Sequence, residues 1–151
     1  MLRILSVLLA TATLALARPA VEDVATATDP PCTTGAAVVT AGYTIKWAPA
    51  IPTESFGHGY RPEPAWARDH VVGTYTFGVP MPIESGFAYA QFKCQYYCNA
   101  QTGAGSFFVD YAGKDSRAGS YCNCYDELLD PESFVENNQT VVGAWNAICK
   151  A

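Results

Sequence analysis

Alternation of apolar and polar residues along the chain predicts four strands, since side chains with a period of two line one face of a sheet. Tyr43, Ile45 and Trp47 alternate with Thr44 and Lys46 in the first of them. The four predicted strands are residues 43–48, 71–77, 106–111 and 120–125. Residues 141–148 fit either a closing strand or a short helix, and the pattern leaves both open.

Residues 85–99 carry the helical period, in which positions three and four apart share one face. Ser85 is placed to cap the start of this helix, and Gly103 lies just past its end. The apolar stripe consists of Phe87, Ala90, Cys94, Tyr97 and Cys98. Together these elements predict a mixed α+β domain in which one helix packs on a small, mostly antiparallel sheet.

Four aromatic residues in these segments have predicted places. Trp47 and Trp145 lie in periodic segments, so we expect both in the core. Tyr97 shares the cysteine stripe and is expected in the core, whereas Tyr96 faces elsewhere.

Residues 49–67 show neither period and are predicted to be irregular. The segment holds four prolines, two glycines and three aromatic residues around His58. A loop of this length is either functional or packed down by its own aromatic side chains. Aromatic faces stack on sugar rings and are frequent at protein-binding sites. The candidate ligand-binding residues are therefore Phe56, His58, Tyr60 and Trp66.

The first seventeen residues have the pattern of a secretory signal peptide. A basic residue precedes an apolar run too short to span a bilayer, and Ala15-Leu16-Ala17 offers small residues for cleavage after Ala17, with Ala20 as an alternative. Residues 18–31 read as a flexible leader, which leaves one domain over residues 32–150. The chain has 9 basic and 14 acidic residues and no basic cluster, which argues against nucleic acid and anionic membranes as partners.

Six cysteines in a secreted chain predict three disulfides, although fifteen pairings are open. Cys94 and Cys98 share a helix face, and Cys122 and Cys124 share a strand face, with a similar rise of about 6 Å. Two neighbouring disulfides would staple helix to strand. A third bridge, from Cys32 to Cys149, would join the chain ends and contribute about 4–5 kcal/mol by closing a loop of about 118 residues. A zinc site with four thiolates is the alternative in a reducing compartment.

The cysteine-bearing half resembles a PAN/apple domain, especially the apple-like domains of small secreted fungal proteins. The matching segments are residues 92–98, 106–111 and 119–125, with Cys32 and Cys149 outside them. The resemblance implies a nested pairing of Cys94 with Cys124, Cys98 with Cys122, and Cys32 with Cys149. It also implies a module that binds proteins or carbohydrates, without family-wide catalytic residues.

Catalytic patterns are weak in this sequence. His58 and His70, with Asp69 beside the second, lack the motif of a known nucleophile or zinc centre, and no cysteine is left over as a nucleophile. The acidic residues 126–132 include a predicted turn at Asp130, and a solvated acidic loop is favoured over a carboxylate pair or a weak calcium site. No cofactor is expected.

The resulting prediction is a secreted, non-catalytic module that recognises a carbohydrate or a cell-wall or matrix glycoprotein. The alternatives are an effector or structural protein acting through protein contacts and, last, a secreted hydrolase. Asn138 begins a sequon for N-glycosylation. The sequence does not indicate whether the protein is a monomer or an oligomer.

Overall fold

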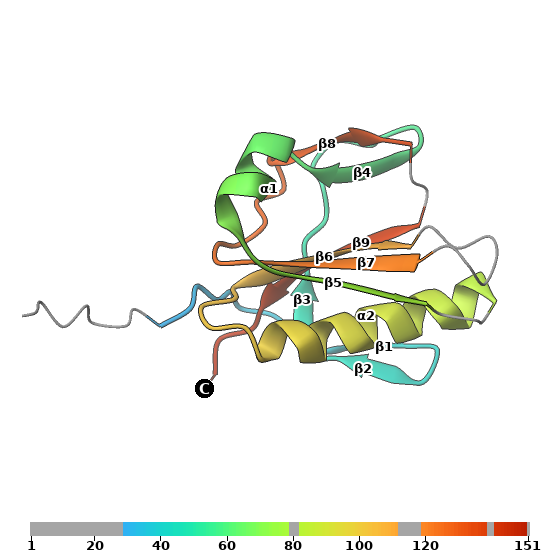
Figure 1. Ribbon diagram of the computed structural model, residues 1–151, viewed down its shortest axis with the longest axis horizontal. Coiled ribbons are helices and arrows are strands. Elements are labelled where there is room, and N and C mark those ends of the chain that lie inside the picture. The colour runs from blue at the N-terminus through green and yellow to red at the C-terminus, as the bar shows by residue number, and fades with distance from the viewer. Residues whose placement is uncertain (1–28, 79–81, 112–118, 139–140, 151) are drawn as a thin grey trace, which may run out of the picture.

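A five-stranded antiparallel sheet forms the middle of three layers (Figure 1). The computed structural model describes residues 29–78, 82–111, 119–138 and 141–150; the predicted signal peptide and most of the leader lie outside them. The strand order is β3-β9-β6-β7-β5. These strands are β3 (Trp47–Pro49), β5 (Val71–Gly78), β6 (Ser106–Tyr111), β7 (Gly119–Tyr125) and β9 (Val142–Ala147).

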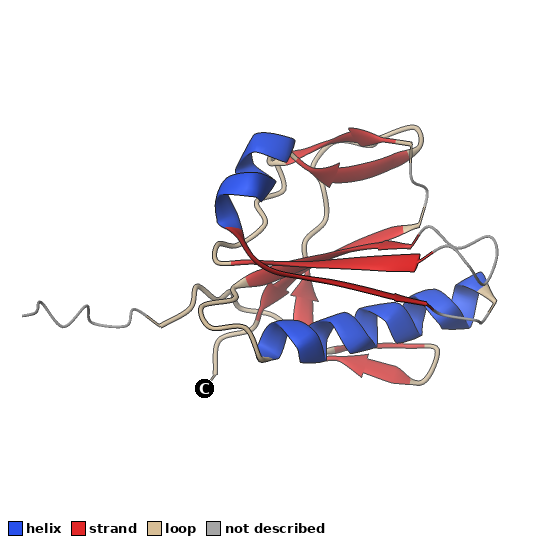
Figure 2. Cartoon of the chain, in the orientation of Figure 1, coloured by secondary structure: helices blue, strands red, loops and turns tan. Residues whose placement is uncertain are grey.

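Different elements cover the two faces of the sheet (Figure 2). The long helix α2 (Ile83–Asn99) and the hairpin of β1 (Val38–Thr40) and β2 (Tyr43–Ile45) pack on one face, which we call the helix side. The short helix α1 (Pro64–His70) and the pair of β4 (Gly59–Pro62) with β8 (Phe134–Asn137) lie over the other, which we call the β4 side. The α+β class with a mostly antiparallel sheet is confirmed, with two helices where one was predicted.

Alternation along the central strand β6 divides the core in two. Phe107 and Val109 point to the helix side, where Trp47 and Trp145 join them in the larger cluster. Phe108 points to the β4 side and packs in a second cluster with Leu129 and other residues. Both tryptophans are buried, as predicted.

Most of the periodic segments form the predicted elements. Strands β5, β6 and β7 and helix α2 agree with the predicted ranges to within two residues, and residues 142–147 form a strand. The predicted strand 43–48 is divided at Lys46, whose backbone N–H donates to Gln95 Oε1 on α2 at 2.8 Å instead of continuing a strand ladder. Gly103 has a φ of 81°, which glycine tolerates.

Two local predictions were wrong. Helix α2 begins at Ile83 after Pro82, and Ser85 lies inside it with its hydroxyl donating to the Pro82 carbonyl at 3.4 Å, so Ser85 is not the cap. The segment 49–67 is not irregular throughout, because it contains β4 and the start of α1. Pro64 fits the first position of α1, where no N–H is needed, and the Glu63 carboxylate accepts from the Trp66 N–H at 2.8 Å.

All six cysteines form disulfides, and one of the three implied bridges, Cys32–Cys149, is present. The nested pairing of the other four is wrong. The structure joins Cys94 to Cys122 and Cys98 to Cys124. The chain reverses direction between α2 and β6 and again between β6 and β7, so α2 and β7 run the same way. Cysteines in the same order along both elements therefore meet.

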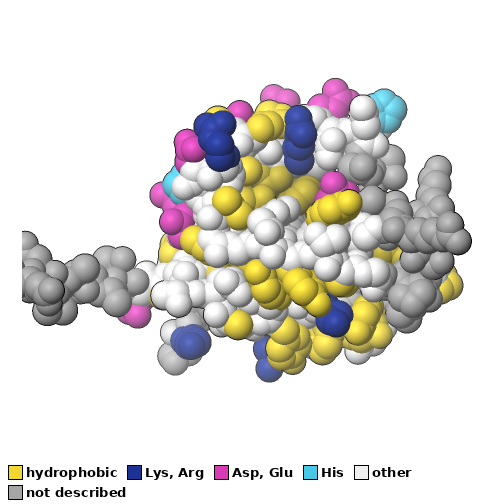
Figure 3. Space-filling model, in the orientation of Figure 1, with side chains coloured by type: hydrophobic (Ala, Val, Ile, Leu, Met, Phe, Trp, Pro, Cys, Tyr) yellow, Lys and Arg dark blue, Asp and Glu magenta, His cyan; other side chains and the backbone are white. Residues whose placement is uncertain are grey.

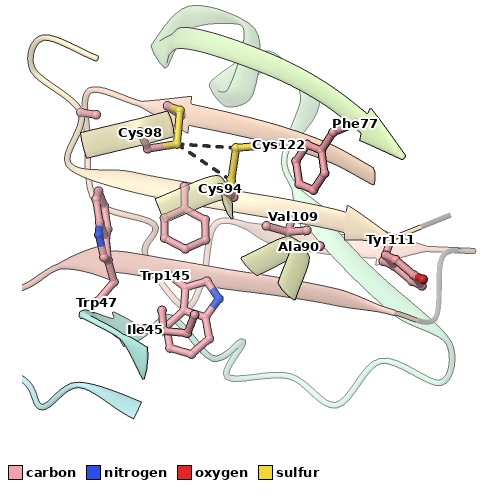
Figure 4. Packing of buried hydrophobic residues seen from close by; sticks show 13 residues of the cluster. Ile45, Trp47, Phe77, Ala90, Cys94, Cys98, Val109, Tyr111, Cys122 and Trp145 are labelled. Atoms are coloured by element: carbon pink, nitrogen blue, oxygen red, sulfur yellow. Dashed lines mark hydrogen bonds between the residues drawn. A yellow bond between two sulfur atoms is a disulfide. The ribbon is translucent and has the colours of Figure 1, made fainter. Parts of the chain in front are cut away.

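The four sulfur atoms of these two bridges lie together in the helix-side core (Figure 4). The Cys98 sulfur is 4.0 Å from that of Cys94 and 3.7 Å from that of Cys122. Oxidised sulfurs carry no hydrogen, so these are packing contacts. The thiolates required by the zinc alternative are absent in this disulfide-bonded form.

Candidate functional site

The predicted binding residue Tyr60 lies on β4 and faces the sheet. Its ring packs edge-on against Phe108 at 6.2 Å and Phe134 at 5.1 Å between centroids. Burial raises the pKa of the Tyr60 hydroxyl above its ordinary value. Phe56 lies 6.4 Å from Tyr60 on the outer edge of the same cluster, and both rings are half-buried. These aromatic side chains attach the elements of the β4 side to the sheet.

Trp66 has a similar packing role on α1. Its half-buried ring lies 5.0 Å from Tyr125 on β7 and 4.9 Å from the His70 imidazole. His58, by contrast, is exposed. The structure therefore brings Phe56, Tyr60 and Trp66 into one apolar cluster and leaves His58 at the surface.

Of the histidine and carboxylate candidates, His70 and two acidic residues lie close together at the surface. His70 Nδ1 is 2.9 Å from Asp126 Oδ1, and His70 Nε2 is 3.7 Å from Glu127 Oε2. Asp69 does not pair with the neighbouring histidine but with Arg68, at 3.1 Å. This arrangement links the end of α1 to the end of β7 and offers no nucleophile.

The remaining acidic candidates form the predicted turn. Asp130 Oδ1 accepts from the Glu132 N–H at 2.9 Å, and the Asp130 carbonyl accepts from the Ser133 hydroxyl at 2.7 Å. Asn138 is exposed at the end of β8, while the other two residues of its sequon lie outside the described part of the chain.

A different set of polar and aromatic side chains gathers on the β4 side of strands β5, β6 and β7. In the sheet register, Asp110 lies opposite Tyr121, which in turn lies opposite Thr76; the next row pairs Thr74 with Asn123. We call these five residues the open sheet face. The Tyr121 ring is 48 % exposed, the threonines are exposed, and the other two are half-buried. This part of the sheet is less covered than the centre, where Tyr60 lies over Phe108.

Asp110 is the unusual member of the open sheet face. Burial raises the pKa of its carboxyl group, and its Oδ1 atom is buried without a hydrogen-bond partner in the described structure. Buried carboxylates are normally hydrogen-bonded or paired with a cation. The described ion pairs of the protein do not include Asp110. Because Asp110 as a whole is half-buried, a ligand that donates hydrogen bonds to the accessible part of its carboxyl group would stabilise the charge.

The molecular surface is hollowed beside these residues. In Figure 3 the depression lies between β4 and α1 above and β5 and β7 below, with apolar atoms at its back. Tyr60 and Trp66 belong to the cluster of the upper wall, and Tyr121 belongs to the floor. The arrangement is a shallow concave surface with aromatic rings and one carboxyl group, as in many sites for small polar ligands.

The open sheet face was missed by sequence reasoning. Its residues lie on three strands that the chain visits in the order β5, β6, β7, so they meet only through the strand register. One local signal was available: Asp110 is the single charged residue of the apolar strand β6, and it takes the face opposite Val109 and Tyr111. A charge in such a strand is expected to have a specific role.

Comparisons with known proteins identify no relative: no protein-family model matches the chain, and no curated protein or solved structure matches it. No helix in the described residues is both long and apolar enough to cross a membrane. The three disulfides are typical of proteins that fold in an oxidising, extracellular compartment.

Proposed function

We propose that this protein is a secreted, non-catalytic binding module that recognises carbohydrate, either free or as part of a cell-wall or matrix glycoprotein. The observation that carries the proposal is the open sheet face, where an exposed tyrosine ring lies next to a half-buried carboxyl group without a partner. Secretion rests on the signal-peptide pattern of residues 1–17 and on the disulfides. The cysteine-bearing half resembles PAN/apple domains, and that family consists of binding modules, which agrees with this function.

Both parts of the site match the chemistry of a sugar. A pyranose ring has an apolar face of C–H groups, which packs on an aromatic ring such as Tyr121. Its rim carries hydroxyl groups, which donate hydrogen bonds to a carboxylate and exchange them with amide and hydroxyl groups. Asn123, Thr74 and Thr76 provide such groups around the ring.

The number of carboxyl groups in the described part of the site supports binding without turnover. A glycosidase needs two, about 5–10 Å apart across the scissile bond. Within the described residues the open sheet face has one, Asp110, while Asp126 and Glu127 are held by His70 at the end of β7.

The test is a binding screen of the folded protein against chitin, β-glucan, mannan and an array of mammalian-type glycans. Tyr121→Ala is compared with Tyr96→Ala, a matched control because Tyr96 is a 58 % exposed tyrosine on α2, on the other side of the sheet. We expect at least one glycan to bind wild type and the control, with the Tyr121 variant at least about tenfold weaker, since stacking contributes about 1 kcal/mol or more beyond simple burial. If wild type binds no glycan, carbohydrate recognition is wrong and a protein partner becomes the better hypothesis.

A further inference from the structure

We infer that the ligand of the open sheet face is a pyranose without acidic groups, stacked on Tyr121, whose neighbouring hydroxyl groups donate hydrogen bonds to an ionised Asp110. This inference rests on the proposed function and specifies the class of sugar and the residue that selects it. It begins from the spacing of the two side chains. Residues directly opposite in an antiparallel pair have Cβ atoms about 5 Å apart. Asp110 and Tyr121 are such a pair, so a ring of sugar size resting on Tyr121 reaches the carboxyl group with its rim.

The carboxyl group of Asp110 needs hydrogen-bond donors. Its Oδ1 atom is enclosed by protein and has no partner in the described structure. Desolvation by burial also raises the pKa of this carboxyl group. Asp110 as a whole is only half-buried, so a ligand donor reaches the accessible part of the carboxyl group and stabilises a charge that has no partner within the described residues.

The charges around Asp110 select against anionic ligands. Tyrosine hydroxyls and a second carboxylate face the same layer, and the histidine nearest to it is held by two carboxylates. The titratable groups that the packed elements turn toward this layer are Tyr60 and Glu136 from the β4–β8 pair, Tyr121 and Tyr125 from β7, and His70 of α1 with its partners Asp126 and Glu127. Arg61 alternates with Tyr60 on β4 and takes the opposite face of that strand. Within the described residues, a uronic acid or sulfated sugar would therefore meet like charge, and the side chains turned toward this layer there include no lysine or arginine.

The ionised form of Asp110 is the better acceptor, and this makes binding depend on pH. A carboxylate accepts on both oxygens, whereas the protonated acid loses part of that capacity. Because the pKa of Asp110 is raised, protonation begins at a higher pH than for an exposed aspartate, and affinity should fall as the solution is acidified through that range.

The experiment measures binding of hexasaccharides to wild type and Asp110→Asn by calorimetry between pH 4 and pH 8. The neutral probes are laminarihexaose, mannohexaose and N-acetylchitohexaose, and the anionic probe is hexagalacturonate. Glu132→Gln is the control, since it removes one negative charge from an exposed side chain on the turn before β8. We expect wild type and control to bind a neutral probe more tightly than the anionic probe. The Asp110 variant should bind about tenfold or more weakly and without the acid-dependent loss.

A melting measurement separates recognition from a structural role. Removal of a buried charge that has no partner should leave the Tm of Asp110→Asn equal to or above that of wild type, while a structural carboxylate would lower it. Three results overturn the inference although glycan binding stands: affinity of Asp110→Asn within twofold of wild type, tighter binding of the anionic probe, or a parallel loss of Tm and affinity. If wild type binds none of the probes or screened glycans, the proposed function itself fails.

Discussion

Gln95 holds the two halves of the interrupted strand 43–48 to helix α2, and its removal gives the sharpest test of the fold. The side chain is 2 % exposed and sits between β2 and β3. Its Oε1 accepts from the Lys46 backbone N–H at 2.8 Å, and its Nε2 donates to the Thr44 carbonyl at 2.8 Å. One amide group thus satisfies the two backbone groups that the break in the strand would otherwise leave open.

Gln95→Met keeps the volume of the side chain and removes both hydrogen bonds. Each bond contributes about 1 kcal/mol net, and a backbone group left without a partner adds to the loss if water cannot reach it. The expected decrease in the free energy of unfolding is therefore about 2–4 kcal/mol. At roughly 4 °C per kcal/mol for a domain of this size, Tm should fall by about 8–16 °C.

The measurement is urea unfolding with the disulfides intact, followed by tryptophan fluorescence. Gln101→Met is the control, because the Gln101 amide makes one long bond of 3.3 Å to the Tyr97 carbonyl of the preceding helix α2 and is only half-buried. If the two variants lose the same free energy of unfolding, the bridging role assigned to Gln95 is refuted.

Three further changes test other contacts of the described structure. Gly143→Ala places a Cβ 2.6 Å from Gln91 Oε1, which accepts from a core indole, so we expect a loss of about 1–3 kcal/mol; a Tm equal to wild type would contradict this close approach. Serine in place of both Cys32 and Cys149 should lower unfolding free energy by about 4–5 kcal/mol, and a loss below 1 kcal/mol would show that the unfolded chain is not restrained by this bridge. The raised pKa of Tyr60 means that the folded state holds its proton more tightly than the unfolded state, so stability should decrease as pH rises above about 10. Urea unfolding at pH 7 and 10.5 should show a smaller decrease for Tyr60→Phe, and equal decreases would refute this linkage.

Sequence periodicity was sufficient to predict the range of an element where that element buries one continuous apolar stripe. Helix α2 and strands β6 and β7 carry continuous stripes that end in the core, and the predicted ranges match the structure closely. The nested cysteine pairing failed because pairing depends on the relative direction of α2 and β7. Spacing along each element contains no information on that direction; two chain reversals determine it.

The elements of the β4 side were harder to predict because their sequence patterns are weaker and their structure depends on partners distant in the chain. Pro62 and Pro64 both indicate a break in regular structure, but their effects differ. Pro62 ends strand β4, whereas Pro64 begins helix α1, which Glu63 caps. Strand β4 is ordered by pairing with β8, about 75 residues later in the chain. The open sheet face has the same origin: Asp110 and Tyr121 are ordinary residues in their own segments and become neighbours only through the register of β6 and β7.

The layout of the three layers has a consequence for engineering and for divergence among homologous proteins. The two excursions that build the β4 side leave the sheet after β3 and β7 and return at β5 and β9, and the disulfides all lie outside them. The stapled helix side and the sheet therefore form a frame onto which these two segments are grafted as a pair. Exchange of both segments together, with the frame kept, should yield a family of display scaffolds whose variable surface differs from one member to the next.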